Sequence, residues 1–171
     1  MRPRTIDYLA GYPEELRLRA AALRAEGVLE ARLAERYPET HSIRSNGALS
    51  DYVQGLKRRC MRSSPPLNKV VYCDKIGTLH NALGTHTYAV RVQGSRLKRK
   101  NELRVGSLFK SLAPEFLTMV VVHELAHLRH RAHDRAFYGL CVHMEPEYHR
   151  YETDLRLLLY ARDAPLDPGG P

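Results

Sequence analysis

The chain has 171 residues, of which 43% are hydrophobic and 27% are charged. This balance excludes a disordered chain, and the length allows one domain with a sizeable core but is too short for two well-developed ones. We expect a single domain over residues 1–171 that ends in a short disordered tail at about residues 164–171. The net charge of +8 is compatible with weak nucleic-acid contact, although an arginine-rich solvated surface is the simpler explanation.

Three cysteines, Cys60, Cys73 and Cys141, are an odd number and form no C-x-x-C pair. They indicate neither a disulfide framework nor a zinc ribbon, and they favour a reducing compartment. No apolar segment of signal-peptide type follows the basic N-terminus, and the uncharged run at residues 116–122 is too short to span a bilayer. We therefore expect a cytoplasmic protein without a membrane partner.

The first part of the chain predicts helices that pack. One helix should begin at Pro13 and reach about Tyr37, with Gly27 as its weak point. Ser50 is a candidate N-cap for a second helix that ends near Cys60. Its basic end can contact phosphate or simply complement the helix dipole. The basic residues there are Lys57, Arg58, Arg59 and Arg62.

Three segments predict strands. Residues 69–72 are one candidate, and residues 86–93 and 102–108 form the clearest pair because both are rich in β-forming side chains. Gly94, Ser95 and the basic run at residues 96–100 connect that pair. We expect an antiparallel hairpin with the basic run at its tip, where it is solvated or contacts an anion.

The most informative stretch is FLTMVVVHELAHLRHRAH, residues 116–133, because it places imidazoles and a carboxylate inside an otherwise apolar helix. His123 and His127 are four residues apart, so they face the same way, about 6 Å apart along the helix axis, and can hold one metal ion. Glu124 lies about 100° round the helix, where it can accept a proton from a water that the metal activates. This H-E-x-x-H arrangement is typical of zinc hydrolases.

A third ligand must come from outside this pair. His130 shares the ligand face but begins about 7 to 8 Å further along the axis. His133 requires the helix, which should reach about His130, to stop and turn back, and Asp134 as the N-cap of a following helix would produce that break. A downstream carboxylate such as Glu152 is a third candidate. The geometry favours His133.

Two helices should follow the motif, one from Asp134 to before Pro146 and one from Pro146 to about Tyr160. Four side chains in this region are within reach to stabilise a developing oxyanion, although packing or surface exposure explains each of them equally well. They are Tyr138, His143, Tyr148 and His149.

The sequence HELAHLRHRAHDRAFYGLCVHMEPEYHRYETDLR, residues 123–156, resembles the YgjP-like zinc metallopeptidase family, whose motif is H-E-L-x-H-x5-H followed by an aromatic residue. NALGTHTYAVRVQG at 81–94, NELRV at 101–105 and GYPEEL at 11–16 resemble the same family's pattern. The resemblance implies Zn2+ on His123, His127 and His133, with Glu124 as base. It also implies an α+β, zincin-like single domain, in which a small antiparallel sheet packs on a central metal-binding helix and further helices lie at both ends.

The activity that this resemblance implies is zinc-dependent hydrolysis, with a peptide or protein as the first candidate substrate. Some YgjP-like proteins are described as nucleoside triphosphate pyrophosphatases, so a nucleotide is an alternative substrate for the same metal site. Zincins of the SprT and Wss1 type share the three-histidine core and act on proteins crosslinked to DNA, which is a further alternative. This chain lacks the cysteine-rich zinc ribbon of SprT proteins.

Overall fold

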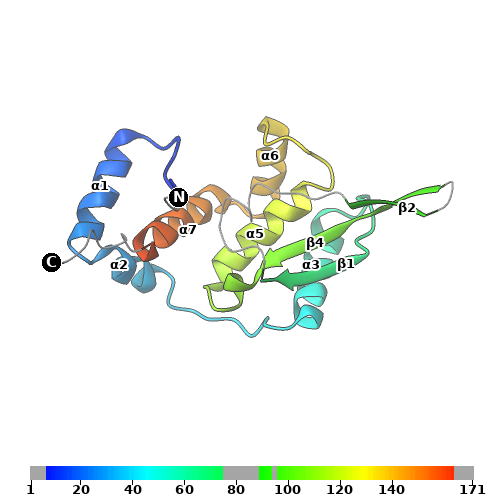
Figure 1. Cartoon of the computed structure of the whole chain (residues 1–171), viewed down its shortest axis with the longest axis horizontal. Helices are drawn as coiled ribbons and strands as arrows, with labels where there is room; N and C mark the ends of the chain where they lie inside the picture. The colour runs from blue at the N-terminus through cyan, green and yellow to red at the C-terminus, as the bar shows by residue number, and fades with distance from the viewer. Residues whose placement is uncertain (1–6, 75–88, 94–95, 164–171) are drawn as a thin grey trace, which may run out of the picture.

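The computed structural model describes residues 7–74, 89–93 and 96–163. It confirms an α+β architecture in which helices outnumber strands (Figure 1). In chain order the elements are α1 (Glu14–Ala25), α2 (Leu29–Arg36), α3 (Asn46–Cys60), β1 (Lys69–Cys73), β2 (Ala89–Gln93), β3 (Arg96–Lys100), β4 (Glu102–Gly106), the short 3-10 helix η1 (Ser107–Lys110), α5 (Pro114–Ala126), α6 (Arg135–Met144) and α7 (Tyr148–Arg162).

Helix α5 lies at the centre of the molecule, between β4 on one side and α6 and α7 on the other. Pro114 occupies its first turn, where the missing backbone N–H has no helical partner to lose. From residue 116 to residue 126 every side chain except that of Thr118 is buried. A helix that is apolar on all sides is stable only in a protein interior. Histidines carried on α5 are therefore held in place by the core.

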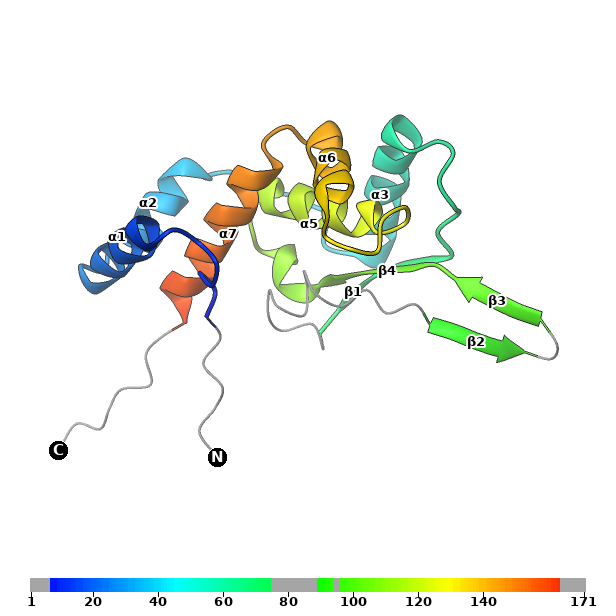
Figure 2. The same cartoon turned by 90° about the horizontal axis from the view of Figure 1, so that it is seen from above.

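The strand pair that adjoins α5 is parallel, whereas the family resemblance implied an antiparallel sheet beside this helix. β1 and β4 run in register from Lys69 opposite Glu102 to Cys73 opposite Gly106. Helix α3 contacts β1 and α5 contacts β4, and Figure 2 shows both helices on the same side of the pair. Parallel strands need a long connection, and the β2–β3 hairpin lies within it, extending away from the helices.

The expected pairing of residues 86–93 with residues 102–108 is wrong. β2 pairs instead with residues 96–100, so the basic run forms strand β3 rather than a hairpin tip. Gly94 and Ser95, together with residues 86–88, lie outside the described residues. Side-chain preferences indicated β2 and β4 but missed β3, and they carry little information about the partner of a strand. Lysine and arginine also suit edge strands, which is why a basic segment can pair.

The N-terminal helix is shorter than expected because Gly27 ends it. This glycine has a φ of 72°, and the N–H groups of Gly27 and Val28 donate to the carbonyl oxygens of Arg24 and Leu23. That pattern is a Schellman motif, in which glycine avoids the steric cost of the left-handed conformation. The expected single helix is therefore two helices, α1 and α2.

Helix α3 begins before its expected start. The Ser45 hydroxyl accepts a hydrogen bond from the Ala48 N–H at 3.1 Å and is the N-cap in place of Ser50.

At the other end of the molecule, Asp154 of α7 is buried and accepts hydrogen bonds from the Tyr37 hydroxyl at 2.5 Å and Arg36 at 2.9 Å. This network holds α2 against α7.

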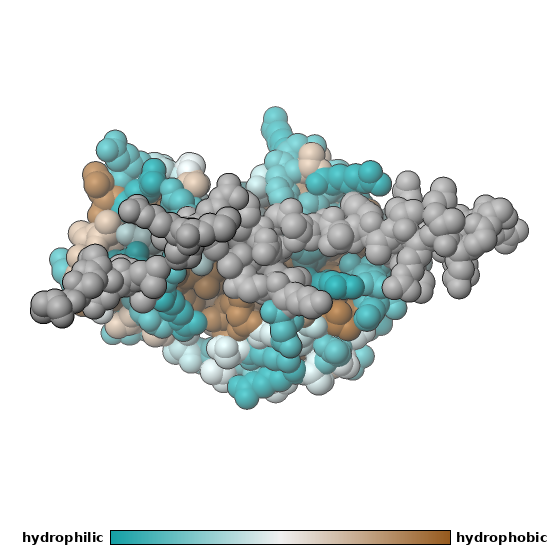
Figure 3. Space-filling model, viewed as in Figure 1, coloured by the Kyte–Doolittle hydropathy of each residue, from teal (hydrophilic) through white to brown (hydrophobic). Residues whose placement is uncertain are grey.

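Apolar side chains form one continuous core around α5. On the face in Figure 3, hydrophobic residues show chiefly near the centre, over α7 and the start of α5, and hydrophilic residues cover much of the surrounding surface. Among the described helices, none combines the length and the apolar content that crossing a membrane requires.

Candidate metal centre

Three histidines from α5 and the loop after it meet at one point. The Nε2 atom of His127 lies 3.3 Å from Nε2 of His123 and 3.1 Å from Nε2 of His133. The three ring centroids are each 4.9 Å from the other two. His123 and His127 are buried, whereas His133 is exposed. The arrangement is a triangle of imidazoles with nitrogen atoms at its centre.

The hydrogen bonds of the other ring nitrogens indicate what this centre can hold. His127 Nδ1 lies 2.9 Å from the His130 carbonyl oxygen, which can only accept, so Nδ1 carries the proton and Nε2 a lone pair. Lone pairs that face one another across such short distances gain stability when a cation lies between them. Two nitrogens bound tetrahedrally to one zinc ion are about 3.3 Å apart. The observed spacing therefore fits a metal ion.

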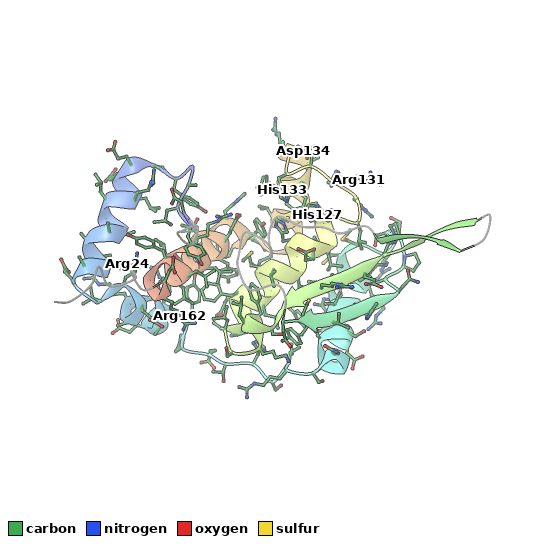
Figure 4. All side chains as sticks on the ribbon, in the orientation of Figure 1. Arg24, His127, Arg131, His133, Asp134 and Arg162 are labelled. Carbon is green, nitrogen blue, oxygen red and sulfur yellow. The ribbon has the colours of Figure 1, made fainter. Side chains whose placement is uncertain are left out.

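The end of α5 explains how His133 reaches the group. The helix stops at Ala126, and the N–H groups of Leu128 and Arg129 make tighter bonds, to residues three positions back. Asp134 then adopts an extended conformation and accepts a hydrogen bond from the Phe137 N–H at 2.9 Å, which caps α6. Figure 4 shows His127, His133 and Asp134 together at this junction. The predicted break is confirmed, but it comes about four residues earlier than His130.

His123 and His127 each have a partner that orients the ring. The Tyr148 hydroxyl of α7 lies 2.7 Å from His123 Nδ1, and Tyr148 is fully buried. Burial, together with the negative charge of Glu152, raises the pKa of Tyr148 far above its ordinary value, so the phenol keeps its proton. Partners of this kind fix the tautomer and direction of metal-binding imidazoles.

Phe137 closes one side of the triangle. Its ring centroid lies 4.9 Å from that of His123, 4.7 Å from that of His127 and 4.8 Å from that of His133. Phe137 itself is fully buried at the start of α6. An apolar ring against all three imidazoles limits their movement and excludes water from that side.

The remaining candidate residues have other positions. His130 contributes its backbone carbonyl rather than its ring to the group, and Glu152 lies 3.4 Å from Arg156 in an ion pair. The Tyr138 ring lies 6.3 Å from the His133 ring, and His143 is exposed. Glu124, one residue after His123 on α5, is only 5% exposed.

Sequence reasoning named Tyr148 as a candidate but did not identify its contact. It considered this tyrosine for oxyanion stabilisation, whereas the hydroxyl contacts His123, which precedes it by 25 residues. The contact of Phe137 with all three histidines was not predicted. Tyr148 lies 25 residues after His123, so no local pattern could reveal its contact.

Comparison with known proteins places the group in a wider context. A family model described as YgjP-like, metallopeptidase domain, matches residues 16–157, a range that includes the three histidines, Phe137 and Tyr148. A protein of Escherichia coli (strain K12) named UTP pyrophosphatase is 51% identical over 154 residues, which cover 90% of this chain and 92% of that protein. No solved structure matches the chain. Both names describe hydrolases.

Proposed function

The chain belongs to the YgjP-like metallopeptidase-domain family, and from this premise we propose that it is a zinc-dependent hydrolase with His123, His127 and His133 as ligands and Glu124 as general base. The geometric support is the triangle of Nε2 atoms at zinc-like spacing. Three protein ligands leave a fourth position for water, as in catalytic rather than structural zinc sites.

The proposed substrate is a nucleoside triphosphate, with UTP as the first candidate. One observation carries this choice, namely the 51% identity over nine-tenths of both chains to a protein named UTP pyrophosphatase. The net charge of +8 also suits a polyanionic substrate. Peptide hydrolysis, which the motif placed first, becomes the second candidate.

In the proposed reaction the oxygen of water forms a bond to phosphorus, the anhydride bond between the α- and β-phosphates breaks, and pyrophosphate leaves. His123, His127 and His133 would hold the zinc ion, which when bound would supply Lewis acidity that lowers the pKa of water towards about 7. Glu124 accepts the proton of the attacking water and returns it to the medium or to the leaving group. Tyr148 and the His130 carbonyl keep His123 and His127 aimed at the metal.

Peptide hydrolysis is retained because two observations favour it. The matching family model carries a metallopeptidase description, and a buried helix presents the H-E-x-x-H pair. In addition, β4 pairs with β1 along one side and with no other described strand. Such an edge can hold an extended peptide by strand addition.

One assay separates the two substrates. The zinc-loaded protein is incubated with UTP and, separately, with casein, and the release of pyrophosphate and of peptides is measured. We expect pyrophosphate from UTP and no peptides. Peptide release without UTP hydrolysis would support the second candidate, and elemental analysis without stoichiometric metal would contradict both.

The variant Glu124→Gln tests the proposed base. Glutamine keeps the shape of the side chain but cannot accept the proton, so we expect full zinc content and a turnover lower by roughly 10²- to 10⁴-fold. Zinc content is measured by elemental analysis and turnover by pyrophosphate release. Unchanged turnover in a variant that binds zinc would remove Glu124 from the mechanism.

A further inference from the structure

A hollow of about 400 Å³ lies at the C-terminal end of α3, and all the side chains that line it are cationic. Its lining residues are Lys57, Arg58 and Arg62, and we call it the α3 hollow. Arg58 and Arg62 are exposed, so a ligand could reach them from solvent.

The cations of the α3 hollow have more charge than their structural role requires. Lys57 donates to the Ser64 carbonyl at 3.3 Å and Arg62 to the Arg58 carbonyl at 3.2 Å, as expected near a helix C-terminus. The helix dipole there amounts to only about half a negative charge. Lys57, Arg58 and Arg62 together carry three positive charges, and Arg59 next to them in the sequence adds a fourth.

Acidic residues close in the sequence do not offset the surplus. The sequence contains no aspartate or glutamate between Asp51 and Asp74. The ion pairs within the described part of the chain involve none of the basic residues at the end of α3. Positive side chains that form no ion pair within the protein repel one another, and a bound anion would reduce that repulsion.

The α3 hollow adjoins the loop that carries the third histidine. Arg129, two residues after His127, donates a hydrogen bond from Nη2 to the Ser63 hydroxyl at 2.9 Å. Ser63 follows Arg62 directly, so this bond ties the edge of the hollow to the histidine loop. Figure 2 shows the loop after α5 beside α3. Arg129 adds a further positive charge at the boundary between the two sites.

We propose that the α3 hollow binds the diphosphate end of a nucleotide substrate, the group that leaves as pyrophosphate. Arginine matches phosphate oxygens with two parallel donors, and lysine supplies a compact charge. The proposal rests on the proposed function for the identity of the ligand. The binding of a phosphate anion in the α3 hollow can be measured without turnover, and therefore separately from the proposed function.

Isothermal titration of the full-length protein with inorganic pyrophosphate tests the hollow. The double variant Arg58→Gln/Arg62→Gln is compared with Arg19→Gln/Arg32→Gln, which removes two exposed charges from α1 and α2. We expect the dissociation constant to rise about tenfold in the first double variant and to stay unchanged in the second. Wild-type binding should weaken from about 50 to about 200 mM salt, because the charges are exposed. Unchanged thermal melting confirms that both variants are folded.

Equal binding by the wild type and the two double variants would overturn the proposal. Equal weakening in both variants would also overturn it, because net charge alone would then explain the binding. Tighter binding of a single-stranded oligonucleotide than of pyrophosphate at the same arginines would also overturn it. With UTP as substrate, we expect a higher KM and a similar kcat in the Arg58→Gln/Arg62→Gln protein. If the wild type does not hydrolyse UTP, the proposed function fails, while the pyrophosphate titration still decides the role of the hollow.

Discussion

At the scale of single residues, metal binding depends on both ring nitrogens of a histidine. One nitrogen faces the proposed metal, and the hydrogen bond of the other orients the ring. His127 is held by the carbonyl of His130, a residue that sequence reasoning considered as a ligand. His123 is held by the buried Tyr148 hydroxyl. A histidine without such a partner can rotate or change tautomer, and its affinity for metal falls.

The variant Tyr148→Phe removes the partner of His123 but keeps the aromatic ring in the core. We expect zinc affinity to fall roughly 10- to 100-fold, because the imidazole loses the hydrogen bond that orients it. Competition with a chromophoric chelator measures the affinity. Tyr138→Phe is the matched control, since the Tyr138 ring lies 6.2 Å from that of Tyr148 but makes no hydrogen bond to a described histidine. An equal loss of affinity in both variants would contradict a specific role for Tyr148.

The local part of the site could be predicted because helix geometry is regular. Four residues of spacing bring His123 and His127 to one face, and the N-cap preference of Asp134 indicated the turn that brings in His133. The contacts of Tyr148 and Phe137 could not be predicted, because they depend on how α6 and α7 pack against α5. That packing is a property of the whole core and leaves no fixed spacing in the sequence.

At the scale of elements, a helix cap decides where the third histidine lies. Asp134→Ala removes the bond to the Phe137 N–H, and we expect a loss of about 1 kcal/mol in the free energy of unfolding. Zinc affinity should fall as well, because His133 directly precedes the cap. Ser45→Ala removes the corresponding cap of α3 and should cost a similar amount of stability without changing zinc affinity. Urea unfolding and chelator competition test both expectations, and equal zinc affinity in the two variants would show that the cap of α6 does not position His133.

The elements themselves were easier to predict than their neighbours. Residues 69–72 and 102–108 were expected as strands, and β1 and β4 form within or close to those limits. Their parallel pairing joins segments more than thirty residues apart in the chain, and only the fold as a whole determines it. The early end of the first helix has a local cause, the Schellman motif at Gly27, which the sequence suggested only as a weak point.

At the scale of the whole molecule, buried phenols and a buried thiol make the folded state sensitive to alkaline pH. Burial raises the pKa of Tyr72, whose hydroxyl donates to the Ile43 carbonyl, to about 12. Burial also raises the pKa of the Cys141 thiol to about 12. The ordinary values in an unfolded chain are about 10 for tyrosine and about 8.5 for cysteine. Above these values the unfolded chain releases protons that the folded protein retains.

Because the unfolded state then binds fewer protons than the folded state, stability must fall as pH rises. The contribution is complete below about pH 8.5 and is lost progressively towards about pH 12. Repulsion between like charges has a different pH dependence, because it is smallest near the pI of 9.6, where the protein carries little net charge. Urea unfolding at about pH 8, 10 and 11 should therefore show a decline that Tyr72→Phe makes shallower between about pH 10 and 11, because this variant removes one of the groups whose pKa burial raises. An identical slope in the wild type and in Tyr72→Phe would mean that the phenol of Tyr72 ionises as readily in the folded protein as in the unfolded chain.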